Sequence, residues 1–396
     1  MELELNRIWT IVVALACIEL GKRLNRKFSW LEKGNIPPSV SAGLVVSLLL
    51  ALVREFGWLD VSLDPVPRDS LLLVFFASLG FGAHLGKLAS AGKGTLMVCI
   101  AIVVLIFTQN IIGMGVAKAF GQPAELGLFC GSIAFLGGHG TAVAWSNTEM
   151  AHSINGAFEL GVGSATLGLV LGGLVAGPVA MFLSRRNTEE IKHSTLFEKD
   201  VVVEVERDHV FSSDRWIISL LFILACVAIG IPMREWLVSQ GKSIPPFLAV
   251  MLVAVALTNI ADLVNKPMDK EVSDLVGTVS LRIFLAMAML SLDWGELAEY
   301  LPLLITASIL QVVGILIITY FLVYLSFGKG NEGSSAAGGF IGFGLGAMPV
   351  GLAVIRRLTD TFGDCPRAIL SLTLAASLFC DTANAVLISA LFKWLG

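Results

Sequence analysis

Two polar residues stand three positions apart inside an apolar segment near the end of the sequence. Asp381 and Asn384 share one helix face, because residues three apart are neighbours on a helix. A carboxylate within an apolar span is costly, and its usual role is in an ion or proton path. Hard oxygen ligands from a carboxylate, an amide and the hydroxyl of Thr382 suit a small cation. We predict a sodium site with Asp381 as counter-charge; a buried aspartate with a purely structural role is the alternative.

Two glycine-rich stretches, at about 124–147 and 333–353, interrupt the apolar sequence. Clustered glycine favours an unwound backbone, which at membrane depth needs protein or water around it. A re-entrant hairpin lining a cavity meets this condition, and its free N–H groups suit an anion such as a carboxylate. The alternative is close helix packing through small residues. The predicted substrate-binding residues are Gly137, Gly138, His139, Gly140, Thr141, Gly342, Gly344 and Gly346.

Other polar residues in apolar segments have a structural interpretation beside the functional one. His139 alone is typical of a hydrogen-bonded structural histidine. Gln109 and Gln311 favour hydrogen bonds between helices, with substrate binding as the alternative. Arg282 lies about two turns inside its segment, where a cation must pair, reach the interface or contact substrate. No nucleophile with a matching base is found, so the sequence predicts no catalytic residues and no enzyme.

The composition places most of this chain in lipid. Hydrophobic residues make up 56% of the 396 and charged residues only 15%, and the mean hydropathy is +0.82. With a net charge of −4 and no basic stripe, the sequence excludes nucleic acid as a partner. We predict an all-α polytopic membrane protein, because about ten apolar segments can span the bilayer. The segments are 8–21, 37–56, 69–86, 94–119, 156–184, 215–238, 245–265, 275–292, 301–327 and 367–395.

The two halves of the chain align in order. Ile36-Pro37-Pro38 matches Ile244-Pro245-Pro246, Phe75 matches Phe284, Gln109 matches Gln311, and 131–141 matches 338–348. Five spans per half, an odd number, require the second copy to enter the membrane from the opposite side. The predicted organisation is a first repeat at 1–184, a linker at 185–214 and a second, inverted repeat at 215–396.

The basic residues predict the orientation of these repeats. With the N-terminus outside, most Lys and Arg residues, including those of the charged linker, lie in the cytoplasm. Both termini are then expected outside, with the linker inside. Two interrupted segments at matching positions also indicate a binding site near the bilayer midplane.

The sequence resembles the bacterial sodium/glutamate symporter family over nearly its whole length. The resemblance rests on Gly137-Gly138-His139-Gly140-Thr141 with Ala144-Trp145-Ser146, Gly342 to Ala347, Asp381-x-x-Asn384-Ala385, Phe284 to Ala288 and Gly168 to Leu174.

This resemblance implies sodium-driven uptake of L-glutamate, a homodimer, termini outside, and inverted repeats with two re-entrant loops. It places both glycine-rich loops near substrate and Asp381 and Asn384 beside the ions. Arg282 departs from the small or uncharged residue that is usual in that helix of the family. Sodium is expected as the coupling ion, with no cofactor. An elevator-like alternating-access mechanism is the expectation, and a sodium- or proton-coupled carrier of a dicarboxylate or citrate is the alternative.

Overall fold

The computed structural model describes residues 2–29, 31, 36–57, 60–86, 92–151, 153–185, 213–240, 244–264, 270–362 and 365–395. The described chain is almost entirely helical, as predicted. One short parallel pair of strands, β1 (Glu2–Leu5) and β2 (Asp60–Leu63), was not indicated by the sequence. The predicted linker at 185–214 lies outside the described residues, apart from its two ends.

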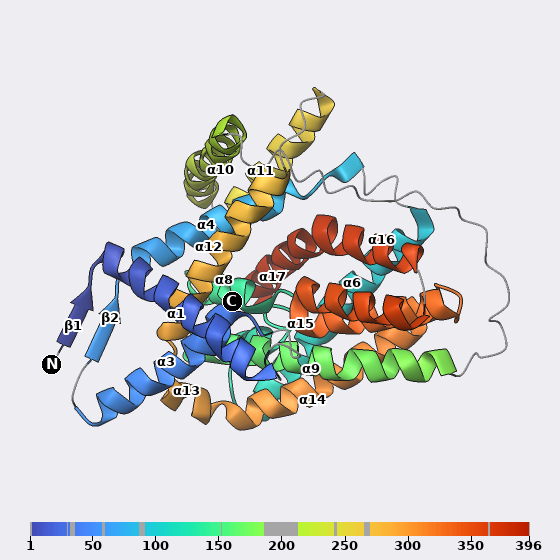
Figure 1. Ribbon diagram of the computed structural model, residues 1–396, viewed down its shortest axis with the longest axis horizontal. Helices are drawn as coiled ribbons and strands as arrows, with labels where there is room; N and C mark the ends of the chain where they lie inside the picture. The colour runs from blue at the N-terminus through green and yellow to red at the C-terminus, as the bar shows by residue number, and fades with distance from the viewer. Residues whose placement is uncertain are drawn as a thin grey trace.

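The helices sort into two bundles (Figure 1). The α12 bundle contains α1 (Arg7–Lys27), α3 (Pro38–Glu55), α4 (Pro65–Phe81), α10 (Ser213–Ser239), α11 (Pro246–Leu263) and α12 (Lys270–Leu290). The α15 bundle contains α6 (Gly92–Ala119), α7 (Ala124–Gly127), α8 (Gly138–Ser146), α9 (Ala157–Arg185), α14 (Leu301–Ile318), α15 (Asn331–Phe362), α16 (Pro366–Ala375) and α17 (Asp381–Leu395). The short helix α13 (Trp294–Glu299) joins the two bundles along the chain and packs on α9.

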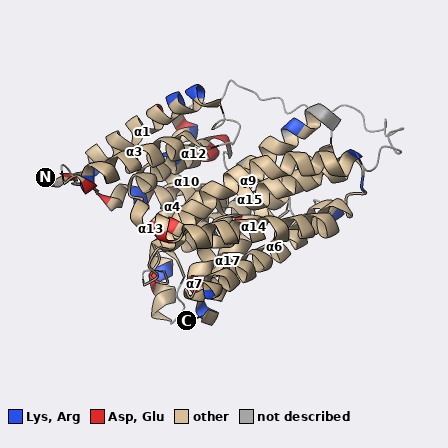
Figure 2. Ribbon diagram, turned by 90° about the horizontal axis from the view of Figure 1, so that it is seen from below, with Lys and Arg blue, Asp and Glu red and all other residues tan. Residues whose placement is uncertain are grey.

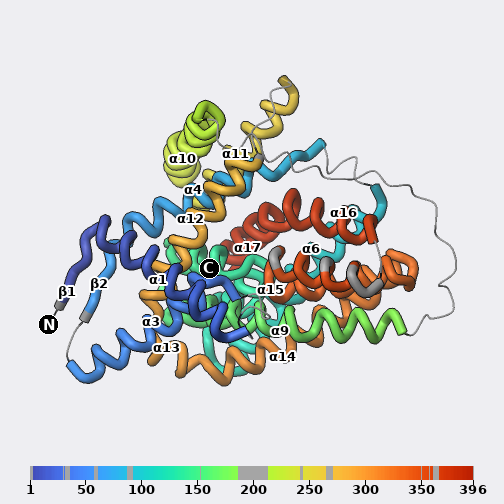
Figure 3. Tube along the Cα trace, viewed as in Figure 1, coloured from blue at the N-terminus to red at the C-terminus, as the bar shows by residue number. Residues whose placement is uncertain are grey.

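Each bundle combines helices from both halves of the chain. In Figure 3, α4 from the first half lies beside α11 and α12 from the second, and α9 lies beside α15. The main helix contacts between the bundles, within the described residues, are those of α12 with α8 and of α11 with α17. There the Trp145 ring lies 5.4 Å from that of Phe247 on α11 and 5.3 Å from that of Phe392 on α17, centroid to centroid. This aromatic cluster lies where the two bundles meet, within a hydrophobic core to which both contribute.

Eight helical segments of the described chain are long and apolar enough to cross a membrane. Two of them are composite: α14 continues through the π-helical turn Thr319–Tyr324, and α16 continues through another into α17. The remaining two predicted spans form α1, of 21 residues, and α4, of 17. The chain is thus a multi-pass membrane protein. Figure 2 shows its Lys and Arg residues mainly at helix ends, where they can reach water.

Proline and short polar side chains start several of these helices where the sequence indicates. α3 and α11 each begin at the second residue of a Pro-Pro pair, because proline at the first helical position loses no hydrogen bond. Asn6 caps α1 by accepting hydrogen bonds from the N–H groups of Ile8 and Trp9, at 3.1 and 3.0 Å. These local signals fix where the chain turns back into the apolar layer.

Candidate functional site

The first glycine-rich segment is a broken helix. α7 passes into the 3-10 turn Leu128–Cys130 and then into irregular turns, and α8 begins only at Gly138. Gly138 has a φ of +73°, in the left-handed region that glycine adopts without strain. Residues 137–141 therefore lie at a chain reversal and at the N-terminus of a nine-residue helix.

The second glycine-rich segment differs from the predicted unwound stretch. Within α15, helical geometry is lost only at Gly346 and at Ala347, which has a φ of +62°. At this break the chain folds back, and a Cβ on Gly342 would lie 3.2 Å from the Cα of Gly351. The two arms of α15 thus pack directly on each other. Glycines before the break serve this close approach rather than unwinding, so the expectation of an unwound backbone in the stretch at about 333–353 was wrong outside Gly346 and Ala347.

The breaks of the two segments meet. A Cβ on Gly138 would lie 3.2 Å from the Cβ of Ala347. α8 begins at Gly138 and the second arm of α15 begins just after Ala347, so two helix N-termini converge here. Helix N-termini carry partial positive charge and N–H donors, which together suit an anion. The structure therefore brings the two predicted groups of glycines together.

Helix α9 holds both segments. A Cβ on Gly172 would lie 3.1 Å from the carbonyl oxygen of Gly342, and one on Gly168 would collide with the carbonyl oxygen of Leu345. His139 Nε2 lies 3.0 Å from Thr166 Oγ1 on the same helix. His139 is thus hydrogen-bonded and buried. The hydroxyl of Thr141 donates to the carbonyl of Gly137 at 3.0 Å, within its own segment.

Two glutamines bridge the halves of the chain in a crossed arrangement. Gln109 on α6 donates through Nε2 to the carbonyl of Gly344 in the second segment, at 2.7 Å. Gln311 on α14 donates to the carbonyls of Gln109 and of Cys130, which lies in the first segment, at 2.8 and 2.9 Å. Each helix therefore supports the glycine-rich segment of the other half. Both side chains are fully buried.

A third link joins α17 to the start of the first segment. Asn384 Nδ2 donates to the carbonyl of Ser132 at 3.1 Å, and Ser132 Oγ donates to Asn384 Oδ1 at 2.7 Å. Asn110 on α6 completes the network, because its Nδ2 lies 2.8 Å from Ser132 Oγ. Sequence reasoning missed Ser132 altogether, since a single serine in an apolar run carries no signal of its own.

Asp381 and Thr382 lie one helical turn from this network. Both are half-buried in the composite span that contains α16 and α17. A π-helical turn, Ala376–Cys380, immediately precedes Asp381, and such turns often occur at functional sites. Within the described part of the chain, no hydrogen bond or ion pair engages the Asp381 carboxylate. Its oxygens are therefore open to a cation.

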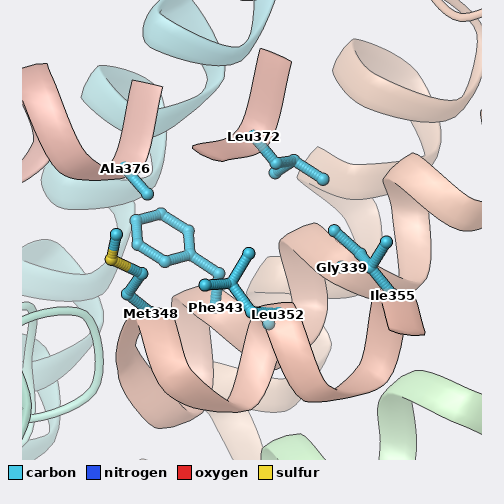
Figure 4. Close-up of a pocket in the computed structure, with 8 residues that line it drawn as sticks. Gly339, Phe343, Met348, Leu352, Ile355, Leu372 and Ala376 are labelled. Atoms are coloured by element: carbon cyan, nitrogen blue, oxygen red, sulfur yellow. The ribbon is translucent and has the colours of Figure 1, made fainter. Parts of the chain in front are cut away.

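A small apolar pocket lies between the arms of α15 and α16, next to the break at Ala347 (Figure 4). Phe343 and Gly339 line it from the first arm, Met348 and Leu352 from the second, and Leu372 from α16. None of these groups can bind a carboxylate or a sodium ion. The converging breaks and the Asp381 region therefore remain the candidate site.

Comparison with known proteins identifies the family. The family model described as sodium/glutamate symporter matches residues 3–364. The chain belongs to the sodium/glutamate symporter family. It is 34% identical over 395 residues to the sodium/glutamate symporter of Escherichia coli (strain K12), covering 97% of each chain. It is also 30% identical over 390 residues to that of Haemophilus influenzae (strain ATCC 51907 / DSM 11121 / KW20 / Rd), covering 97% of this chain and 96% of the other.

Membership of the sodium/glutamate symporter family confirms the resemblance drawn from the glycine-rich motifs. It also confirms that the chain is a transporter rather than an enzyme. The matched range begins in β1 and ends after α15, so both glycine-rich segments lie inside it.

Proposed function

We propose that this protein is a secondary active transporter that takes up L-glutamate together with sodium. The family match over residues 3–364 carries the proposal, and relatives that share 30–34% of their residues with this chain are sodium/glutamate symporters. Sodium is the coupling ion, and no cofactor is required. Binding of the cation lowers the cost of placing anionic glutamate in low dielectric, so each ligand tightens the other.

The substrate site lies where the two glycine-rich segments meet. The contact between Gly138 and Ala347 supports this placement, because two helix N-termini meet there and both favour an anion. A carboxylate of glutamate accepts hydrogen bonds from backbone N–H groups of these segments. The residues concerned are Gly137, Gly138, His139, Gly140, Thr141, Gly342, Gly344 and Gly346.

The sodium site lies beside Asp381, with Thr382 and Asn384 as further oxygen ligands. The open carboxylate of Asp381 inside a membrane span supports this assignment. Asn384 also ties the ion region to the first glycine-rich segment through Ser132. Sodium binding is thereby coupled to the position of a segment that contacts substrate.

Transport proceeds by alternating access, with the α15 bundle as mobile core and the α12 bundle as scaffold. Each helix packs mostly on helices of its own bundle, which supports an elevator-like shift of one bundle against the other. Ten spans form two inverted repeats, each with a re-entrant hairpin, and the crossed bonds of Gln109 and Gln311 are consistent with that symmetry. Both termini face the periplasm of a bacterial inner membrane, with the linker in the cytoplasm. The protein is a homodimer, as its family resemblance implies.

Uptake of labelled L-glutamate into proteoliposomes containing only this protein tests the function. An inward sodium gradient should drive accumulation, and an inward potassium gradient should not. Absence of sodium-dependent accumulation would contradict the proposal, and labelled aspartate, citrate and malate would then identify another carboxylate as substrate. Competition among the same compounds measures how narrow the specificity is.

The variant Asp381→Asn tests the ion site. Loss of the negative charge should weaken the dependence of uptake on sodium, seen as a higher sodium concentration for half-maximal rate. Asp293→Asn is the matched control, because Asp293 is exposed and caps α13, and asparagine caps a helix equally well. A wild-type sodium dependence in Asp381→Asn would remove Asp381 from the ion site.

A further inference from the structure

Arg282 is an exposed cation in the middle of a membrane-spanning helix. It follows the start of α12 at Lys270 by 12 residues, which is about 18 Å along the helix axis. Its side chain is exposed, and within the described residues it forms no ion pair or hydrogen bond. An arginine at this depth is expensive unless it faces water or an anion.

The other exposed residues of α12 indicate whether Arg282 faces water or hydrocarbon. Glu271, Asp274, Thr278 and Arg282 follow one another at helical spacings of three, four and four, so they form one stripe, and all four are exposed. The opposite face of the same stretch is buried, with Gly277 packed on Ser78 of α4. Leu275 and Val279 are exposed beside them, but an arginine and two carboxyl groups along one line need water or an opposite charge. These four residues, the α12 polar stripe, therefore suit the wall of an aqueous path.

The α12 polar stripe begins at the candidate substrate site. Leu281, the neighbour of Arg282, packs on the first glycine-rich segment: a Cβ on Gly140 would lie 3.3 Å from Leu281 Cδ1. From this contact the stripe runs toward the Lys270 end of the helix. There Glu271 is paired with Arg215, at 3.7 Å. Arg282 is thus the member of the stripe that lies nearest in sequence to the contact with the glycine-rich segment.

We propose that Arg282 binds the side-chain carboxylate of the substrate. This inference rests on the proposed function. The converging helix N-termini take the α-carboxylate of L-glutamate, and the guanidinium of Arg282 pairs with the second carboxylate across the bundle boundary. Arginine suits this role because its planar fork matches a carboxylate with two parallel hydrogen bonds. Arg282 is therefore a specificity-determining residue, which favours an acidic side chain over a neutral one.

Because Arg282 belongs to the α12 bundle and the glycine-rich segments to the α15 bundle, the pair forms only when the bundles are arranged as they are here. Arg282 then contacts the substrate in only one of the two end states of the transport cycle. An anionic lipid headgroup offers similar chemistry, but headgroup phosphates lie at the membrane surface rather than about 18 Å along the span.

The test compares wild-type protein with Arg282→Gln, Arg282→Lys and the control Lys118→Gln, at an exposed lysine in the last turn of α6, in proteoliposomes. Two quantities are measured: the L-glutamate concentration for half-maximal sodium-driven uptake, and inhibition by L-glutamine, which lacks the second negative charge. Arg282→Gln should raise the half-maximal concentration about 10- to 100-fold, the worth of one charged hydrogen-bonded pair. L-Glutamine should inhibit this variant about as well as L-glutamate does. Lys118→Gln should behave as wild type.

Arg282→Lys keeps the charge but loses the two-pronged geometry, so a rise of about 3- to 10-fold with retained preference for glutamate is expected. If Arg282→Gln fails to insert into the membrane, the Arg282→Lys variant still tests the proposal. Unchanged half-maximal concentrations in the Arg282 variants would overturn the proposal. So would a defect that disappears in pure phosphatidylcholine vesicles and returns with phosphatidylglycerol, because Arg282 would then bind lipid. Sodium-driven uptake by the wild-type protein is measured first. If the wild-type protein takes up L-glutamate and the Arg282 variants do not differ from it, only the role of Arg282 is contradicted; if the wild-type protein shows no uptake, the proposed function itself is contradicted.

Discussion

In the segment from 137 to 141 the glycines stand at a turn and at the start of a short helix, whereas in α15 they lie inside two long arms packed on each other. The first segment meets the α12 bundle through flexible side chains, Leu281 and Phe75, each 3.3 Å from a Cβ on Gly140. The second is held within its own bundle by backbone, through the contacts of α9 with Gly342 and Leu345.

This difference assigns separate mechanical roles to the two segments. Contacts between side-chain ends can be broken and remade with little loss when bundles shift, because rotamers adjust. Contacts between backbones cannot adjust without moving whole helices. The second segment therefore serves as the fixed wall of the site within the α15 bundle. The first segment forms the boundary at which that bundle meets its neighbour.

The largest effect on stability is expected when a methyl group is added where α9 contacts the backbone of the second segment. Gly168→Ala would drive a Cβ into the carbonyl of Leu345, forcing α9 and α15 apart at a cost of about 2–3 kcal/mol. Gly140→Ala should cost less than about 0.5 kcal/mol, because Leu281 and Phe75 can move aside. Thermal unfolding in detergent measures both. Equal midpoints for the two variants would show that the segments do not differ in this way.

Substitution of the two glutamines compares the same two segments, with a smaller expected effect on stability. Gln311→Leu removes the donor to two buried carbonyls, those of Gln109 and Cys130, and should lower the unfolding free energy by about 2 kcal/mol. Gln109→Leu removes one donor, to Gly344, and should cost about 1 kcal/mol. Leucine has a similar volume, so packing is nearly preserved. A larger loss in Gln109→Leu than in Gln311→Leu would mean that the second segment, not the first, depends more on its glutamine.

The main features of this arrangement could be predicted from sequence, because they depend on local composition and spacing. Apolar runs of sufficient length mark the spans, and clustered glycines at matching positions mark both segments. Asp381 and Asn384 stand out because polar residues are rare in such runs. Each of these signals lies within about 20 neighbouring residues.

The partners of these residues could not be predicted, because they come from distant parts of the chain. Asn384 pairs with Ser132 from 252 positions away, and Gln109 reaches Gly344 across 235. Nor could composition locate the break in α15. Glycines before Gly346 look the same in sequence whether they unwind a helix or let two arms approach, and only the packing against Gly351 and α9 decides.

A smaller effect than that of either glutamine is expected at the hydrogen bond that ties the first segment to α9. Thr166 Oγ1 lies 3.0 Å from His139 Nε2, and it also donates to the carbonyl of Val162 at 2.9 Å. Thr166→Val keeps the shape and removes the hydroxyl, at a cost of about 0.6 kcal/mol, typical of one hydrogen bond between membrane helices. Thr166→Ser keeps the hydroxyl and serves as the control. If the first segment is the adjustable boundary, Thr166→Val should alter the L-glutamate concentration for half-maximal uptake more than it alters the unfolding midpoint. A loss of stability as large as that of Gln311→Leu would instead make His139 a structural anchor, and both segments would then be fixed walls.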